Sequence, residues 1–369
     1  MITSSEEKTV NNYNPKNERI KKQYLDFEKE ARGRSESTVD AIVKSIVRFE
    51  EYTKWRDFNR FHIRQAVAFK AHLGDQKNAV TGNPLSKSTI TMTLGHLRRF
   101  IQWLSMQPGY KKLAYMDADY FNPSEKDLRI ASAKRTTKVP SVEQIRHVLQ
   151  TMPTSSAIEL RNRAVIAFTC LTGARIAAIS SFRLKHIDLV EKCVHQDARE
   201  VKTKNSKTFM TFFFPMGEPF EQIVIEWVSF LREELFWGDD DPLFPMTAVG
   251  LNSNHEFCAF GLKREHWRSS AGIRAIFREA FKLAGLPSFN PHAFRNMIVR
   301  FGEQMCRTPE EFKSWSQNIG HENVMTTFAS YGEVAEHRQK ELLVRMNSQP
   351  EDEKQVLADI ISQLASLKR

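Results

Sequence analysis

Six polar side chains between residues 175 and 331 are of types that could take part in attack on a phosphodiester bond. Arg175 follows a Thr-Gly turn, while His292 and Arg295 are three residues apart and therefore share one face of a helix. His321 follows a glycine, and Tyr331 comes ten residues later in the stretch GHENVMTTFASYG. The sixth is a lysine from a polar turn between two β-favouring segments. Together they could hold a phosphodiester, neutralise the charge of its transition state and attack it with a phenol oxygen.

Each residue type suits one part of that reaction. Arginine forms two parallel hydrogen bonds to non-bridging phosphate oxygens and stays charged. A phenol has a pKa of about 10, so the attacking oxygen needs nearby cations or a base to lose its proton. Histidine donates hydrogen bonds or transfers protons near neutral pH, and a lysine whose pKa is lowered by neighbouring cations can protonate the departing alkoxide. No metal is required for this chemistry.

Taken singly, each residue also has an ordinary structural explanation. Tyr331 recurs at helical spacing with Val324 and Phe328, which is the pattern of a buried helix face. An arginine after Thr-Gly is often a surface residue, and His292 could cap a helix. The order and spacing of the whole set therefore carry the functional interpretation.

In order and spacing, this set resembles the active site of tyrosine recombinases, the phage-integrase family. The resemblance implies that Tyr331 is the nucleophile, which forms a 3′-phosphotyrosyl link to DNA and frees a 5′-hydroxyl. It implies that Arg175 and Arg295 bind the scissile phosphate. It also implies that His321 assists phosphate binding in the transition state and that His292 is an acid/base or hydrogen-bond partner.

The resemblance is strong over residues 141–344 and weaker, in pattern rather than motif, over residues 18–120. It favours Lys204, in TKNSK, as the hairpin lysine that serves as general acid. Lys202 is the alternative, because the register of a hairpin is not fixed by sequence, and Lys207 is expected to be a phosphate contact or a surface residue.

Three positions depart from the family's pattern. Ala178 stands where an acidic residue often supports the first arginine, so Arg175 is expected to lack one partner. Asn296 stands where histidine is common, and the interval from His321 to Tyr331 is ten residues where nine is frequent. None of these changes removes a group expected to touch the phosphate.

The apolar periodicity predicts a fold that is mainly α with a small β-hairpin or sheet. Two domains are expected, an N-terminal helical core-binding bundle and a C-terminal α+β catalytic domain, with strands only between residues 193 and 215. The expected divisions are a disordered tail (1–18), the core-binding, DNA-binding domain (19–123), a basic linker (124–140), the catalytic domain (141–347) and a C-terminal helix (348–369).

Two helices dominate the predicted N-terminal bundle. One begins with Ser37 as its cap and has Asp40 three residues on. The other runs through SKSTITMTLGHLRRFIQWLS and places His96, Arg98 and Arg99 on or near the face opposite its apolar stripe. We expect Arg98 and Arg99 to contact DNA.

In the second domain, Ser141 opens a helix with a capping signature. A second helix follows through AIELRNRAVIAFTCLTGAR. Thr326 and Thr327 are expected to start a short helix that delivers Tyr331. Helices are expected at residues 220–235, 270–284, 292–305, 309–319 and 326–331.

Two segments outside the catalytic set could contact partners. The predicted linker has five Lys and Arg between residues 126 and 138 against one acid, so Lys134 and Arg135 could lie along a phosphate backbone; a solvated linker is the alternative. The last helix has an apolar stripe from Val356 to Leu367. It could fold back on its own domain or be exchanged between subunits.

The overall composition is compatible with this chemistry. With 54 Lys and Arg against 44 Asp and Glu, the net charge is +10, which favours a polyanion such as double-stranded DNA. The chain lacks an apolar run of about eighteen residues and a signal-peptide core, so a cytoplasmic, bacterial protein that avoids membranes is expected. The four cysteines are expected to be reduced core thiols. His255 and Cys258 have no second pair to complete a zinc site, and no cofactor is expected.

The expected function is that of a site-specific DNA recombinase, an integrase or transposase of a mobile element. It would act as a homo-tetramer on two DNA sites without metal or ATP. One alternative is a non-catalytic DNA-binding accessory protein with a recombinase-like fold, which is disfavoured because all six positions are filled. The other is a type IB topoisomerase, which relaxes supercoils without a second site.

Overall fold

The computed structural model describes residues 13–79, 81–133, 138–321, 339–341 and 343–344. The chain divides into two compact units, Met1–Lys134 and Arg135–Arg369. Helices dominate both units and the strands form two small antiparallel sheets, which confirms the predicted fold class. None of the described helices is both long and apolar enough to cross a membrane. Tyr331, Lys134, Arg135 and the helices predicted at 326–331 and 348–369 lie outside the described residues.

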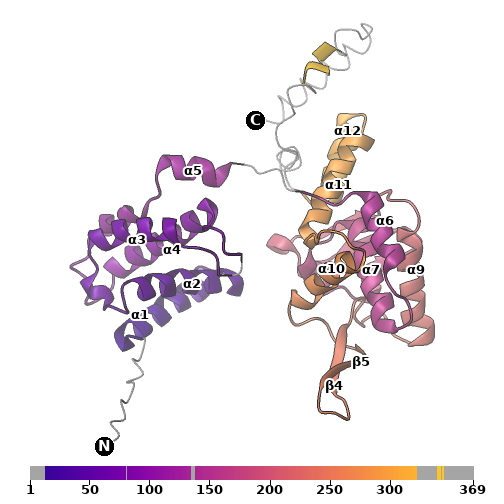
Figure 1. Ribbon diagram of the computed structural model, residues 1–369, viewed down its shortest axis with the longest axis horizontal. Helices are drawn as coiled ribbons and strands as arrows, with labels where there is room; N and C mark the ends of the chain where they lie inside the picture. The colour runs from indigo at the N-terminus through magenta and orange to yellow at the C-terminus, as the bar shows by residue number, and fades with distance from the viewer. Residues whose placement is uncertain (1–12, 80, 134–137, 322–338, 342, 345–369) are drawn as a thin grey trace, which may run out of the picture. The chain divides into compact units, whose positions relative to one another are not determined.

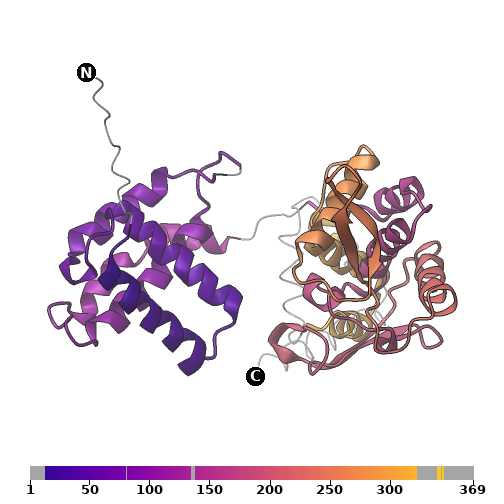
Figure 2. The ribbon, with the colours of Figure 1, turned by 90° about the horizontal axis from the view of Figure 1, so that it is seen from below.

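The described part of the N-terminal unit is a bundle of five α-helices (Figure 1), which Figure 2 shows turned by 90°. Their apolar faces meet in one core, where Phe49 packs edge to face against Phe69 and Phe121. The predicted apolar stripe is buried, including Leu94 and Leu97. The helices are α1 (Pro15–Asp26), α2 (Glu36–Tyr52), α3 (Ile63–Asp75), α4 (Lys87–Ser105) and α5 (Glu125–Ser132).

Two predicted starts in this unit are wrong by a few residues. Helix α1 begins at Pro15 and not after residue 18, because proline fits the first helical turn and Asn17 is fully buried. Helix α2 takes Ser35 and not Ser37 as its cap residue. Both errors arise because several polar residues in a row offer more than one possible cap.

Two other features of this unit depend on contacts between helices. His96 is buried and not on the outer face of α4, because its Nδ1 forms a 2.8 Å hydrogen bond with Oγ of Ser45 on α2. The stretch predicted to be a linker contains α5, whose Asp127 pairs with Lys87 of α4 at 2.7 Å.

The helices of the C-terminal unit pack around α7, in which residues 164–172 are all buried. Capping boxes at Ser141 and Ser156 fix the starts of α6 and α7, the first as the sequence predicts. Of the four cysteines, all free thiols, Cys170 and Cys193 are buried but Cys258 and Cys306 are partly exposed, so the expectation that all lie in the core is wrong for two. The helices are α6 (Val142–Thr151), α7 (Ala157–Thr172), α8 (Ile176–Ile179), α9 (Phe220–Ser229), α10 (Ala271–Leu283), α11 (Pro291–Met305) and α12 (Pro309–Asn318).

The first sheet occupies the predicted β-segment. Its strands are β1 (Ile187–Asp188), β2 (Cys193–Gln196) and β3 (Phe209–Phe212), antiparallel in the order β1-β2-β3. Strands β2 and β3 pair from Cys193 with Phe212 to Gln196 with Phe209. Residues 197–208 therefore form the connection that carries the three candidate lysines.

A second sheet, which the sequence did not predict, is the hairpin of β4 (Met246–Leu251) and β5 (Phe257–Lys263). The hairpin extends away from the helices of its unit (Figure 1). Its apolar side chains Val249, Leu251 and Phe257 are exposed, so the segment lacks the alternation typical of a half-buried strand. The expectation that strands occur only between residues 193 and 215 is wrong for this reason.

Candidate active site

The turn between α7 and α8 positions Arg175. Helix α7 ends at Thr172, and its C-cap residue Gly173 is in the left-handed region with φ of 59°. Arg175 follows as the N-cap residue of α8. A Cβ on Gly173 would lie 3.2 Å from Cδ1 of Ile298, so the glycine also permits the close approach of α11. The Arg175 side chain is half-buried beside that helix.

Arg295 connects its own helix to the segments that carry Arg175 and His321. It lies on α11, is 4% exposed, and its Nη1 donates to the carbonyl oxygen of Gly173 at 3.0 Å. Its Nη2 donates to the carbonyl oxygen of Ile319, at the end of α12, at 2.6 Å. A guanidinium has five N–H donors, so donors remain for an anion after these two bonds.

The two histidines lie next to this guanidinium. His292 is in the first turn of α11 with its side chain exposed, and His321 is half-buried two residues beyond Ile319. The backbone N–H of His321 donates to the carbonyl oxygen of Ser316 at 3.1 Å, which fixes the residue to the end of α12. The fold therefore brings residues from positions 175, 292, 295 and 321 to one place.

Burial, together with the charges of this cluster, lowers the pKa of both imidazoles and favours their neutral form. Burial lowers the pKa of His321 to about 4, and the charges of Arg295 and Arg175 add to the effect. Surrounding protein atoms partly desolvate His292 despite its exposed side chain, and they lower its pKa together with Arg295 and Arg175. Burial, with Arg175 second, lowers the pKa of Arg295 to about 9, so this residue stays charged at neutral pH. A neutral imidazole can donate one hydrogen bond and accept another.

This positive cluster lacks a protein anion among the described residues. The causes of the pKa shifts of Arg175, His292 and Arg295 are burial and neighbouring positive charges, with no described carboxylate among them. The Arg175 guanidinium forms no hydrogen bond or ion pair with any described residue, and Ala178, where an acid would have supported it, is buried and apolar. The site thus has the electrostatics of an anion-binding site.

Among the candidate lysines, Lys204 is the one whose charge affects the pKa of residues in this cluster. It begins the short 3₁₀ turn Lys204–Ser206, and its charge helps to lower the pKa of both His292 and His321. The charge of Lys202 instead lowers the pKa of His266. This placement is compatible with the expectation that Lys204, and not Lys202, acts with the cluster.

The residues expected to contact DNA differ in their exposure and in their hydrogen bonds to the protein. Nε of Arg98 donates to Oδ1 of Asp119 at 2.9 Å, whereas Arg99 is exposed on α4. Lys202 is exposed and Lys207 is half-buried. Arg99 and Lys202 are therefore the more accessible of the described candidates.

Two glycines that sequence reasoning treated only as turns also shape the site. Gly173 permits the close approach of α11. Gly320 has φ of 79°, and a Cβ there would lie 2.6 Å from the ring of Phe209 on β3. Their place in Thr-Gly and Gly-His was the available signal, but the sequence does not show which side chain packs against each backbone.

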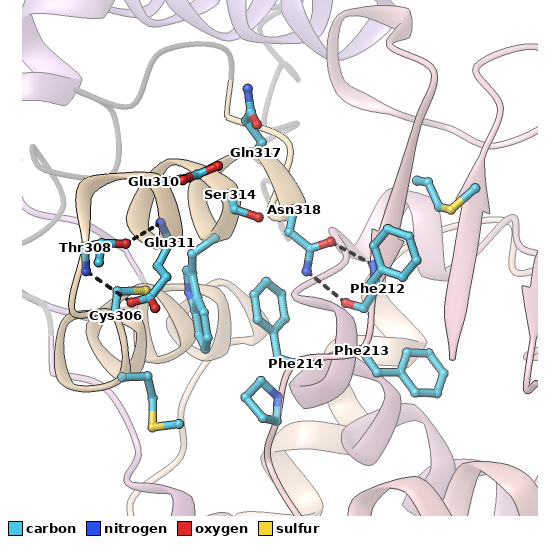
Figure 3. Close-up of a pocket in the computed structure, with 14 residues that line it drawn as sticks. Phe212, Phe213, Phe214, Cys306, Thr308, Glu310, Glu311, Ser314, Gln317 and Asn318 are labelled. Atoms are coloured by element: carbon cyan, nitrogen blue, oxygen red, sulfur yellow. Dashed lines mark hydrogen bonds between the residues drawn. The ribbon is translucent and has the colours of Figure 1, made fainter. Parts of the chain in front are cut away.

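A large groove lies beside the cluster but contains none of its residues (Figure 3). Its volume is about 1000 Å³. One side is β3 with the residues that follow it, and the other side is α12. The side chain of Asn318 bridges the two sides by hydrogen bonds to the backbone N–H and carbonyl of Phe212, at 2.8 and 2.9 Å. The walls include the aromatic rings of Phe213, Phe214 and Trp315.

A family model decides what kind of protein carries this site. The model of the phage integrase family matches residues 138–338, which is more than half of the chain and includes all six candidate residues. The chain belongs to the phage integrase family. It is a tyrosine recombinase, an enzyme of the class that cleaves and religates DNA.

Individual relatives are distant but cover most of the chain. The tyrosine recombinase XerC of Lactobacillus delbrueckii subsp. bulgaricus is 22% identical over 315 residues, 84% of this chain and 92% of its own. A structure of the Tn1549 transposon integrase with transposon right end DNA has a TM-score of 0.57 at 12% identity, covering 89% of this chain and 99% of that one. The recombinase XerH bound to its difH substrate has a TM-score of 0.52 at 16% identity, covering 88% and 84%. These structures share the fold of this chain.

Proposed function

We propose that the chain is a site-specific DNA recombinase whose reaction passes through a covalent link between Tyr331 and DNA. One observation above all supports the proposal. Two arginines and two imidazoles whose pKa is lowered converge at one place, and the charge of Lys204 contributes to lowering the pKa of both imidazoles. Tyr331 lies outside the described residues, so its role is supported by its place in the sequence, ten residues after His321.

In the proposed cleavage step, the phenol oxygen of Tyr331 forms a bond to phosphorus while the bond from phosphorus to the 5′ oxygen breaks. Lys204 Nζ gives a proton to the departing oxygen, which leaves as a 5′-hydroxyl. His292, neutral because its pKa is lowered, can accept the phenol proton. In religation a 5′-hydroxyl attacks the phosphotyrosine and each proton moves the opposite way. The phosphotyrosyl bond retains the energy of the phosphodiester, so the scheme needs no ATP.

The remaining groups stabilise the charge that builds up on phosphorus. Arg175, whose guanidinium makes no hydrogen bond to a described residue, offers all its side-chain donors to the non-bridging oxygens. Arg295 offers the donors not used by Gly173 and Ile319. His321 donates its ring N–H. Groups fixed before the substrate arrives need not reorganise during the reaction, and losing one typically costs about 10²–10³ in rate.

The proposed substrate is double-stranded DNA with specific recombination sites. The net charge of +10 supports it, as do the DNA-bound structures of the Tn1549 integrase and XerH. Arg99, Lys202 and Lys207, with Lys134 and Arg135, would contact phosphates and contribute little to sequence recognition.

The proposed working assembly is a homo-tetramer. Exchange between two duplexes breaks four strands, and each break consumes one tyrosine, so four protomers are needed. We propose that the stretch from residue 348 to 369, with its apolar stripe, docks into the aromatic groove of a neighbouring protomer (Figure 3). Cyclic exchange of one segment per protomer would close a ring and leave no groove exposed.

Two biological roles are compatible with this chemistry. We favour integration or excision of a mobile element, which the fold shared with the Tn1549 transposon integrase supports. The XerC relatives, matched over 92% of their length, support a Xer-type recombinase as the second candidate. Sequencing genomic DNA trapped covalently by the protein would separate the two. Sites at both ends of a discrete element support the first role, and one fixed site without such an element supports the second.

The catalytic proposal itself is tested with nicked substrates that trap the covalent complex. A DNA segment with a nick near the scissile phosphate loses its short 5′-hydroxyl fragment after cleavage, so religation fails and the adduct accumulates. Peptide mapping should place the DNA on Tyr331. Adduct on another residue would refute the proposal. So would the absence of adduct on nicked DNA that the protein binds. Relaxation of a supercoiled plasmid that lacks the site would instead identify a type IB topoisomerase.

A further inference from the structure

One buried hydroxyl connects the element that carries Arg175 to the connection that carries Lys204. Ser181 follows α8, is 6% exposed, and its Oγ is 3.0 Å from the carbonyl oxygen of Ala178, to which it donates. The same Oγ accepts a hydrogen bond from the backbone N–H of Lys202 at 2.9 Å. Ser181 is therefore bonded on one side to the α8 turn, which begins after Arg175, and on the other to a residue two positions before Lys204.

The rest of the connection is fixed at points farther from Lys204. The N–H of Ala198 donates to Oγ1 of Thr208 at 3.1 Å and closes the base of the connection. Glu200 forms an ion pair with Lys185 at 2.9 Å and a hydrogen bond with Nε2 of His186 at 2.8 Å. Among the described residues, the bond from Lys202 to Ser181 is the last hydrogen bond to the body of the unit before Lys204.

The backbone beyond that bond turns sharply. Asn205 and Ser206 both have positive φ, of 59° and 50°. The Lys204 side chain is exposed, so packing does not fix its place. Its distance from the arginines must therefore be set by the backbone on which it stands, and the bond to Ser181 ties that backbone to α8.

We propose that Ser181 is a positioning residue for Lys204, the general acid of the proposed function on which this inference rests. Its hydroxyl holds the connection at a fixed distance from the Arg175 turn. Without it the ammonium of Lys204 would reach the departing oxygen in a smaller fraction of complexes, while the arginines and histidines would keep their places.

The neighbouring serine is a matched control. Ser180 is also 6% exposed, but its Oγ donates only to the carbonyl oxygen of Ala177, at 2.8 Å, and bonds to no part of the connection. Ser180→Ala and Ser181→Ala therefore remove the same atom from adjacent buried positions. The two variants differ in the loss of the bond to Lys202.

The test compares two nicked substrates that differ in one atom. In the first the scissile 5′ bridging atom is oxygen, and in the second it is sulfur. A departing thiolate is stable without a proton, because thiols have a pKa of about 8.5, so the sulfur substrate needs no general acid. Single-turnover cleavage at saturating protein is measured for both.

Ser181→Ala should slow cleavage of the oxygen substrate roughly 10-fold, on the scale of a misplaced catalytic group, and cleave the sulfur substrate within about 2-fold of the parent. Ser180→Ala should match the parent on both. Equal loss on the two substrates, or no loss on either, would overturn the proposal.

Lys204→Ala separates this inference from the proposed function. It should lose roughly 100-fold or more on oxygen and recover on sulfur. If sulfur rescues Lys204→Ala but not Ser181→Ala, only the role of Ser181 is refuted. If sulfur fails to rescue Lys204→Ala, the general-acid assignment fails and the role of Ser181 fails with it.

An isosteric pair keeps the test valid if Ser181→Ala fails to fold. Ser181→Thr and Ser181→Val add the same volume at this buried position and differ only in the hydroxyl. The threonine variant should cleave the oxygen substrate faster than the valine variant by roughly 10-fold, and the two should be equal on sulfur. Equal rates on oxygen would overturn the proposal.

Discussion

Alanine at each of the two arginines should separate catalysis from folding stability. Both guanidiniums are proposed to bind the scissile phosphate, but only Arg295 also serves the fold, through Gly173 and Ile319. The Arg175 guanidinium forms no hydrogen bond with a described residue, and its charge adds to burial in disfavouring the charged form of Arg295. The same substitution should therefore have similar effects on cleavage and different effects on unfolding.

The magnitudes follow from those contacts. For either variant the loss of one pre-organised contact should slow cleavage by more than about 100-fold, equivalent to about 2.7 kcal/mol. Arg295→Ala leaves two carbonyl oxygens without donors, at about 1–3 kcal/mol each, and relief of a buried charge offsets part of this. A net loss of about 1–4 kcal/mol in the free energy of unfolding is expected. Arg175→Ala should change it by less than about 0.5 kcal/mol, or raise it slightly.

Two assays on the same preparations decide the matter. Urea unfolding of the DNA-free protein gives the free energies, and single-turnover cleavage of a nicked site gives the rates. If Arg175→Ala destabilised the protein as much as Arg295→Ala, the view that the Arg175 guanidinium stabilises no other part of the described structure would be wrong. If either variant cleaved at near the parental rate, that arginine would not bind the scissile phosphate.

Four further predictions follow. Tyr331→Phe should abolish the covalent adduct and leave site binding within about 3-fold in a gel-shift assay, because only the attacking oxygen is lost; an adduct in that variant would refute the assignment. The pKa of His321 falls from 6.5 to about 4 on folding, so the unfolded chain binds more protons than the folded protein between these pH values. Stability that is present above about pH 6.5 should therefore be lost as the pH falls towards 4. His321→Gln should reduce that loss by about 1–2 kcal/mol in urea titrations at pH 7 and 4.5, after allowance for solvent screening; an unchanged acid dependence would contradict it. Replacing Lys134 and Arg135 by alanine should make the log–log salt dependence of DNA binding shallower by about 1–2 units, and an unchanged slope would show that they do not touch DNA. Removing residues after Ser348 should leave binding to one site intact but reduce tetramers on DNA in size measurements; tetramers formed as readily as by the full chain would exclude docking between protomers.

Local signals explain most of what the sequence predicted correctly. The capping box at Ser141, the prolines that open α11 and α12, and the apolar stripe of α4 each act within a few residues, so they can be recognised without knowledge of the fold. The three-residue spacing of His292 and Arg295 is local in the same sense. The order of the candidate residues supplied the family, and through it the expected roles.

The parts that escaped prediction depend on contacts between distant segments. The bonds of Arg295 reach partners 122 and 24 residues away in the chain. The burial of His96 depends on Ser45, 51 residues away. The β4–β5 hairpin was missed because several of its apolar side chains are exposed.

The electrostatics of the cluster couple substrate binding to the completion of the site. In the free protein, burial and the charge of Arg175 lower the pKa of Arg295, and burial with the charges of both arginines lowers the pKa of both histidines. A phosphodiester placed between the arginines would supply the missing anion and raise all of these pKa values towards their ordinary range. By linkage, the protein should then take up protons when it binds DNA below about pH 6.5. The uptake should be strongest at pH values where His321 is neutral in the free protein and protonated in the DNA complex. The proposed recombinase would thus reach its most favourable charge distribution only with a phosphate in place, which favours cleavage at a bound site and disfavours a reactive tyrosine in the free protein.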